Sequence, residues 1–125
     1  MTLQKLLDLI DELKPNTMSQ AAKVGFISEI EGKIHTEIIM RHAHEDSEET
    51  MPTYDGSTAL STEVLIDSPY HMVYVYWVLS KLDEQYREWD EFNNHRALFD
   101  AAYKELAEHW TSTHMPIQPA PFYIL

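Results

Sequence analysis

The sequence predicts an all-α fold: a small bundle of about four helices, with a long loop between the second and third and with long final helices. Apolar residues recur every three or four positions over most of the chain, which is the period of a helix with one buried face. No glycine or proline interrupts the chain between Pro69 and Pro116. Residues 40–67 lack the helical period and hold seven acidic residues against one basic residue, which is typical of a loop.

The first predicted helix follows Thr2, a good N-cap residue, and ends before Pro15 and Asn16. Its buried face is predicted from leucine and isoleucine residues at helical spacing: Leu3, Leu6, Leu7, Ile10 and Leu13. A second helix is predicted from about Ser19, with one apolar face formed by Val24, Ile27, Ile30, Ile34 and Ile38. Gly25 and Gly32 lie inside it and predict a close approach of another helix, because each costs about 1 kcal/mol relative to alanine.

The loop over residues 40–67 contains two distinctive segments. Arg41–Glu49 carries His42 and His44 followed by four acidic residues, and it is predicted to be a solvated acidic loop. The segment Ala59–Ile66 (ALSTEVLI) resembles a β-strand. We expect it to pair with a neighbouring subunit and to lie outside the core.

Ser68 and Pro69 predict the start of the third helix, because proline is favoured at the first helical position. The apolar stretch that follows, MVYVYWVL, predicts a buried central helix. One helix over residues 69–110 would be about 63 Å long, whereas a compact chain of this length has a radius of gyration of about 14 Å. The helix therefore either bends near Tyr86–Asp90 or projects as an arm.

The core is predicted to combine residues of the second half with apolar residues of the first two helices. From the second half we expect Trp77, Leu82, Trp89, Phe99, Tyr103 and Leu106 to be buried. Their predicted partners are Leu6, Ile10, Ile27 and Ile34.

The composition excludes several classes of function. The chain carries 21 acidic and 9 basic residues, a formal net charge of −12, so autonomous binding to DNA phosphates is disfavoured. It has no cysteine, which excludes disulfides and thiolate chemistry. It has neither a membrane-spanning apolar run nor a signal-peptide pattern. Residues 116–125 form an apolar, proline-rich tail, which we expect to dock on another surface.

Four histidines follow an acidic residue by four positions, a spacing that suits metal chelation but also simple ion pairing on a helix. The pairs are Glu31 and His35, Asp67 and His71, Glu91 and His95, and Glu105 and His109. The Glu-x-x-His spacing of di-iron bundles is absent, as are the common nucleophile and phosphate-loop motifs. We therefore predict surface ion pairs, with no catalytic residue, no cofactor and no metal site. A metal-dependent helical-bundle enzyme that uses these pairs remains the alternative.

The second half contains the segment NNHRALFDAAY (Asn93–Tyr103), together with Asp67–Tyr70, Tyr74–Tyr76 and Thr113–Pro116. On these residues, and most specifically on the first segment, it resembles the head–tail connector proteins of tailed bacteriophages and prophages. The first half agrees through Lys14–Asn16 and Glu29–Ile34, so the resemblance covers essentially the whole chain as one domain, residues 1–125. The family often carries a glycine near Arg87, where it would supply a helix bend.

The resemblance implies an all-α structural adaptor without catalytic activity, assembled in the bacterial cytoplasm and built into the virion. It implies a dodecamer-like ring of identical subunits between the phage portal protein and a tail-side head-completion protein, with DNA passing through the lumen without sequence-specific binding. A ring needs different patches on opposite sides of each subunit. The predicted contact residues are Ala59, Leu60, Val64, Leu65, Ile66, Ile117, Phe122, Tyr123, Ile124 and Leu125. A small regulatory protein-binding module is a further alternative.

Overall fold

The computed structural model describes residues 1–42 and 50–113. Its α-helices are α1 (Leu3–Leu13), α2 (Gln20–Ile34), α3 (Met72–Gln85) and α4 (Trp89–Thr113). A π-helical turn, η1 (His35–Ile39), and a 3-10 turn, η2 (Met40–His42), extend α2. The described residues contain no β-strand, so the predicted all-α class is confirmed, together with the long loop before α3 and the long final helices.

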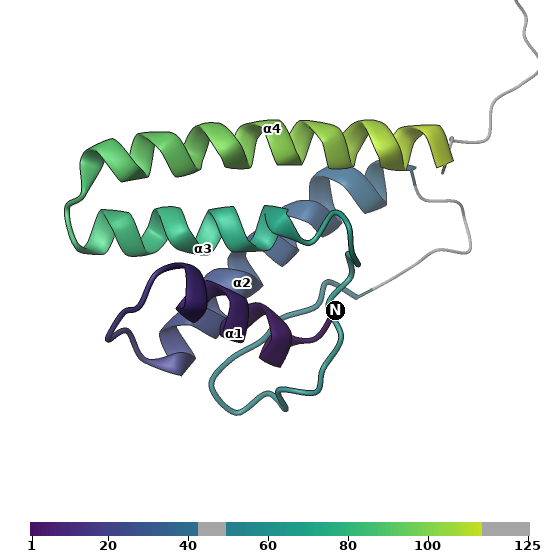
Figure 1. Cartoon of the computed structure of the whole chain (residues 1–125). Helices are drawn as coiled ribbons and strands as arrows, with labels where there is room; N and C mark the ends of the chain where they lie inside the picture. Colours follow the sequence, from purple (N-terminus) through teal and green to yellow (C-terminus); the bar gives the residue numbers. More distant parts are fainter. Residues whose placement is uncertain (43–49, 114–125) are drawn as a thin grey trace, which may run out of the picture.

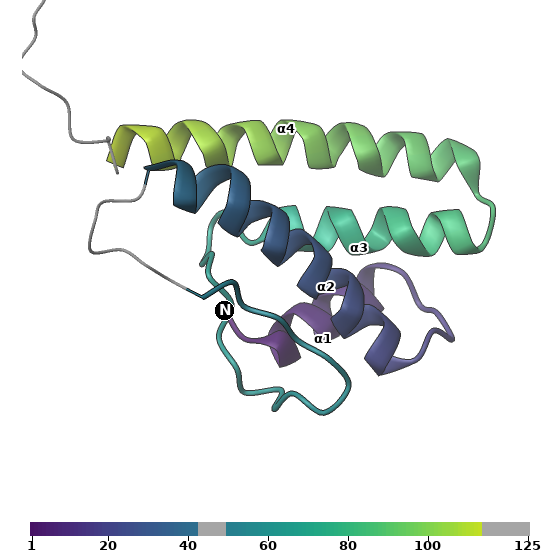
Figure 2. The ribbon, with the colours of Figure 1, turned by 180° about the vertical axis from the view of Figure 1, so that it is seen from behind.

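The helices form a bundle in which α3 occupies the centre. Helices α3 and α4 run antiparallel and side by side, and α1 and α2 lie on the other side of α3 (Figure 1). Seen from behind, α2 and its extension run diagonally from α1 towards the C-terminal half of α4 (Figure 2). No helix in the described part of the chain is both long enough and apolar enough to cross a membrane.

Helix α1 begins and ends as the sequence predicts. The Thr2 hydroxyl accepts a hydrogen bond from the backbone N–H of Lys5 at 3.2 Å and caps the helix. The chain becomes extended at Lys14, because the residue before a proline is disfavoured in the helical conformation. The apolar face is buried through Leu3, Leu6, Leu7 and Ile10, but Leu13, at the last turn, is 52% exposed.

Helix α2 also follows its predicted cap, with the Ser19 hydroxyl accepting from the N–H of Ala22 at 3.1 Å. The predicted buried face is confirmed, because Val24, Ile27, Ile30, Ile34 and Ile38 are all buried. The interpretation of the two glycines was wrong. A side chain at Gly25 would meet nothing within 4 Å, and at Gly32 it would meet the sulfur of Met51, in the loop, at 3.1 Å.

Helix α3 is the buried helix that its apolar sequence predicts. Six of its apolar residues belong to the core: Val73, Tyr74, Val75, Val78, Leu79 and Leu82. The predicted start at Pro69 is wrong by three residues. The Ser68–Pro69 peptide is cis, residues 68–71 form turns, and the helix begins at Met72.

The predicted bend near Tyr86–Asp90 is confirmed, because α3 ends at Gln85 and α4 begins at Trp89. Helix α4 folds back along α3 and does not project as an arm (Figure 1). Its inward face buries Phe99 and Leu106, with Tyr103 half-buried. Trp89 is 53% exposed, so its predicted place in the core is wrong.

The segment over residues 59–66 packs on its own domain, which corrects the expectation that it pairs with a neighbour. The backbone N–H of Leu3 donates to the carbonyl of Thr62 at 3.0 Å, and that of Val64 donates to the carbonyl of Met1 at 2.9 Å. These bonds and a single β-bridge between Thr2 and Glu63 tie the segment to the start of the chain. Alternating apolar residues indicated a strand, but the short N-terminal segment offers only one bridge.

Candidate functional site

The outer face of α4 carries part of the segment NNHRALFDAAY, residues Asn93–Tyr103. Asn93, Asn94, Ala97 and Ala101 are exposed there, and Leu98 is 45% exposed. Phe99 and Leu106 hold the opposite face of the helix against the core. The outer face of α4 therefore presents small and polar side chains to solvent, with Leu98 as an exposed large apolar residue among them.

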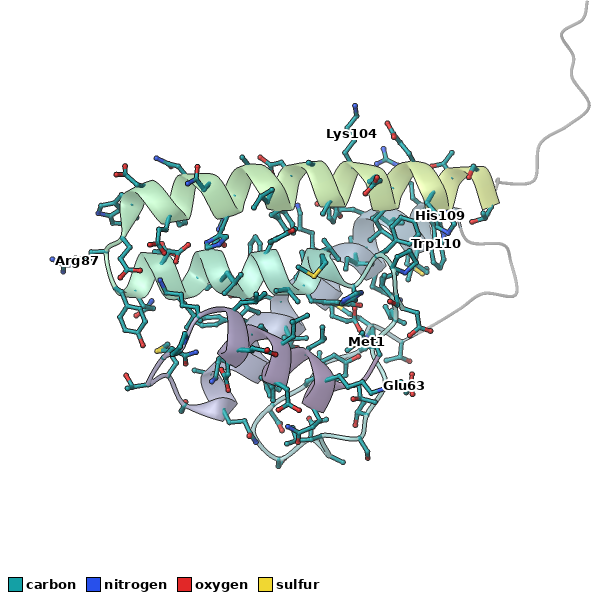
Figure 3. All side chains as sticks on the ribbon, in the orientation of Figure 1. Met1, Glu63, Arg87, Lys104, His109 and Trp110 are labelled. Carbon is teal, nitrogen blue, oxygen red and sulfur yellow. The ribbon has the colours of Figure 1, made fainter. Side chains whose placement is uncertain are left out.

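A shallow depression of about 420 Å³ lies on this face. Its lining comes mainly from α4, with one residue from α3: Tyr76, Leu98, Ala101, Ala102, Lys104, Glu105 and Glu108. Lys104 points away from the body of the molecule (Figure 3). The depression is open to solvent, has alanines in its lining and is bordered by charged side chains. Such a surface suits contact with another helix better than enclosure of a small molecule.

Helix α4 is held on α3 by an arginine placed between aromatic rings. The Arg96 guanidinium carbon lies 4.6 Å from the ring centre of Trp77 and 5.0 Å from that of Phe92. Its Nε donates a hydrogen bond to the Ser80 hydroxyl at 3.0 Å. Cation–π contacts with partly desolvated rings fix the rotation of α4 about its axis, and so fix which side chains face outwards.

A charged cluster locks the hairpin end of α3 and α4 onto α1. The Lys14 ammonium lies 3.0 Å from the fully buried Asp83 carboxylate and 3.1 Å from Glu91, and it also pairs with Glu88. Burial opposes the charged lysine, but hydrogen bonds to Glu88, Asp83 and Glu91 outweigh it and raise the pKa of Lys14. The His95 ring bonds the second oxygen of Asp83 through Nδ1.

This cluster is also where metal ligands could gather. Asp83, Glu88 and Glu91 are the group of three potential ligands that converges within the described residues. The Lys14 ammonium already lies among their oxygens, so the carboxylates neutralise a cation that the chain itself supplies. The arrangement therefore serves to hold helices together.

The four predicted acid–histidine pairs have other contacts in the structure. Glu31 accepts hydrogen bonds from tyrosines and a backbone N–H, Asp67 pairs with the amino group of Met1, and His95 bonds Asp83. The His109 ring stacks on Tyr70 with ring centres 4.4 Å apart. A spacing of four residues predicts a contact only where both residues lie on one helix and face solvent. In this structure, contacts with other parts of the chain decide the partners. The acidic stretch 43–49 and the side chain of His42 lie outside the described residues.

Glu31 positions the loop that precedes α3. Its carboxylate accepts hydrogen bonds from the Tyr54 hydroxyl and the Leu65 N–H, both at 2.8 Å, and from the Tyr74 hydroxyl. The Tyr74 hydroxyl in turn accepts from the N–H of Ile66 at 3.0 Å. Burial, with the neighbouring Glu31, raises the pKa of both tyrosines. Sequence periodicity did not indicate this network, although Glu31 falls on the buried face of α2.

The predicted contact residues divide into three groups. Val64 and Ile66 are buried in the chain's own core, at 6% and 3% exposure, and Leu60 packs against that core. These three residues are therefore not exposed on the surface, as the predicted contact with a partner would require. Ala59 is exposed and Leu65 is 40% exposed, so both are available to a partner. The remainder, Ile117 and Phe122 to Leu125, lie outside the described residues.

A second groove, of about 310 Å³, lies between the turn before α3 and the C-terminal end of α4. It is lined by Leu65, Ile66, Asp67, Ser68, Pro69, Tyr70, Leu106, His109 and Trp110. His109 and Trp110 lie on the side of α4 that faces the rest of the molecule (Figure 3). With Tyr70, His109 and Trp110 in its lining, the groove has more aromatic side chains than the depression on the outer face.

Comparison of the chain with protein-family models, with curated proteins and with solved structures found no match.

Proposed function

We propose that this protein is a structural subunit of a phage or prophage head–tail connector. Identical copies form a closed ring beneath the portal, and DNA passes through the lumen on its way to the tail-side head-completion protein. The observation that carries this proposal is the exposure of the resembling residues around Leu98 on α4. The all-helical fold agrees with what the resemblance implies for such an adaptor.

A closed ring needs two different patches on each subunit, because its contacts run head to tail. The outer face of α4, centred on Leu98, supplies the first patch. The second patch lies around the exposed loop residues Ala59 and Leu65, together with tail residues Ile117 and Phe122–Leu125. The two patches come from different parts of the chain, as a head-to-tail contact requires.

The charge of the subunit suits a DNA conduit. A net charge of −12 per copy gives a surface that does not grip phosphates, so DNA would pass without being held. The same charge opposes ring closure, because like charges gather as copies assemble. The distance over which charges repel one another before salt screens them is about 10 Å at 0.1 M salt and about 30 Å at 0.01 M. Added salt should therefore favour assembly.

Sedimentation velocity tests the proposal, using the full chain with and without a purified portal protein over a salt series. We expect monomers or weak association alone, and rings at high protein concentration or on the portal, favoured by salt. Leu98→Asp should abolish these assemblies, whereas Leu13→Asp, an equally exposed leucine on α1, should not. The proposal fails if no condition yields association with the chain itself or with a portal, or if both variants assemble normally.

A further inference from the structure

The groove at the end of α4 is an apolar surface without an occupant among the described residues, and the chain continues directly beside it. Leu65 is 40% exposed in the groove, and Tyr70 and Trp110 are half-buried around it. Helix α4 ends at Thr113, three residues after Trp110. At 1.5 Å per residue, this end lies about 5 Å along the helix axis from Trp110.

The chain beyond Thr113 has the composition of a segment that binds such a groove. Residues 114–125 contain no Asp, Glu, Lys or Arg, although the protein as a whole carries 30 such residues (21 acidic and 9 basic). They include Pro116 and Pro119, spaced as Pro-x-x-Pro, then Pro121 and the apolar run Phe122–Leu125. Pro-x-x-Pro segments favour the polyproline II conformation and dock in grooves lined by aromatic side chains.

The groove matches this chemistry. Pro69, Tyr70, His109 and Trp110 supply flat ring surfaces, and the Tyr70 and His109 rings are already stacked. Asp67 is the charged carboxylate in the lining, and it pairs with the amino group of Met1. A segment without charged side chains can therefore enter without removing a charged side chain from water, which would be costly.

Length and concentration favour docking within one chain. Twelve residues can span up to about 40 Å, so a return from Thr113 to a groove that begins beside Trp110 needs no stretching. A short tether holds a segment near its own groove at an effective concentration of about 1 mM, far above the micromolar concentration of a dilute protein.

We propose that residues 116–125 dock in the groove of their own chain, with the prolines against Tyr70 and Trp110 and the apolar end covering Leu65. The proposal concerns the free protein and does not depend on ring formation. A docked tail would cover Leu65 and would itself form the outer surface of the second contact patch described above.

A spin label tests this directly, because the chain has no cysteine and a single one can be introduced. Full-length protein carrying Ala120→Cys with a nitroxide is measured by NMR for broadening of the backbone amides of Asp67, Ser68 and Tyr70. A random tail also passes near the end of α4, so broadening alone does not decide. The decision comes from adding Leu65→Asp, which removes an apolar wall of the groove, and from its matched control Leu13→Asp, an exposed leucine on α1 outside the groove.

We expect broadening of these amides that Leu65→Asp reduces several-fold and Leu13→Asp leaves unchanged, with no dependence on protein concentration. Should Leu65→Asp disturb the fold, visible as shifts at Val73–Leu82, the tail variant Pro119→Ser combined with Phe122→Ser replaces it. Equal broadening in all variants overturns the proposal. A mixed sample of spin-labelled and ¹⁵N-labelled copies gives the remaining test: broadening between copies that grows with concentration also overturns it, and assigns the groove to the tail of a second copy.

Discussion

The Glu31 carboxylate on α2 accepts a hydrogen bond from the Tyr74 hydroxyl on α3, and both side chains are fully buried. The same carboxylate binds the Tyr54 hydroxyl and the Leu65 N–H. Three donors, two from the loop before α3 and one from α3 itself, thus converge on one acidic side chain. An ionised carboxylate has only acceptors to offer, so it can satisfy all three donors at once.

Glu31→Gln should lower the free energy of unfolding by about 2 kcal/mol. The amide group must turn its N–H₂ towards one of the donors, which leaves that buried donor without an acceptor. Urea unfolding followed by circular dichroism measures the effect. Glu29→Gln is the matched control, because Glu29 is exposed on the same helix and its 3.7 Å pair with Lys81 lies near the surface. Equal stability of the two variants would show that the network adds little.

The raised pKa values of Tyr54 and Tyr74 predict a loss of stability at alkaline pH. In the unfolded chain both hydroxyls lose their protons near pH 10. In the folded chain, burial and Glu31 keep them protonated to higher pH. Above about pH 10 the folded state therefore binds more protons, and the free energy of unfolding falls as pH rises. Below pH 10 this contribution is constant.

Urea unfolding at a series of pH values between about 8 and 11 checks this prediction. Tyr54→Phe should flatten the decline, because one fewer proton distinguishes the folded from the unfolded chain. If the free energy of unfolding falls with pH as steeply in this variant as in the parent, Tyr54 has the same pKa in the folded and the unfolded chain. Tyr54 is half-exposed, so its share should be smaller than that of Tyr74.

The helices and most of the core follow from the sequence, because local rules decide them. Thr2 and Ser19 cap α1 and α2 as predicted, and the isoleucine face of α2 is buried throughout. These features depend on side-chain period and on hydrogen bonds within four residues, which a sequence displays. The bend predicted near Tyr86–Asp90 follows from the length of the uninterrupted span, which is too great for one helix in a compact chain.

The contacts between distant segments could not be predicted in the same way. Lys14 meets Asp83 across 69 positions, and Glu31 meets Tyr74 across 43. Val64 and Ile66 are buried because the start of the chain offers backbone partners to their segment, and nothing in its own sequence indicates this. The exposure of Leu98 was likewise not indicated by the sequence, because an apolar residue within a helix can face the core or the solvent until the neighbouring helix is placed.

Phe99→Ala should lower the free energy of unfolding by about 3–5 kcal/mol, as for other fully enclosed phenylalanines. Phe99 is 4% exposed, and its ring centre lies 5.2 Å from that of Trp77 and 5.5 Å from that of Tyr103. Trp89→Ala is the contrasting variant on the same helix, because Trp89 is 53% exposed and should cost under about 1 kcal/mol. Chemical denaturation of both variants measures the difference, and similar losses would place Trp89 in a buried contact after all.

Arg87 closes the turn between α3 and α4 in an unusual backbone conformation. Its φ of 58° lies in the left-handed region, and Arg87 is the one non-glycine residue with a positive φ among the described residues. The N–H of Arg87 donates to the carbonyl of Glu84 at 3.2 Å, and the N–H of Glu88 donates to that of Asp83 at 2.9 Å. This pair of bonds is a Schellman motif, in which the left-handed position is usually glycine.

Arg87→Gly should therefore stabilise the protein by about 1 kcal/mol. A residue with a Cβ costs about 1–2 kcal/mol in the left-handed region, and the greater freedom of glycine in the unfolded chain offsets part of the gain. The Arg87 side chain points away from the molecule, so little contact is lost (Figure 3). Thermal unfolding should show a rise of about 3–5 °C in Tm. Arg87→Ala is the control, because it removes the side chain but keeps the Cβ, and it should change Tm little. Equal gains from both variants would trace the effect to the arginine side chain and refute the backbone explanation.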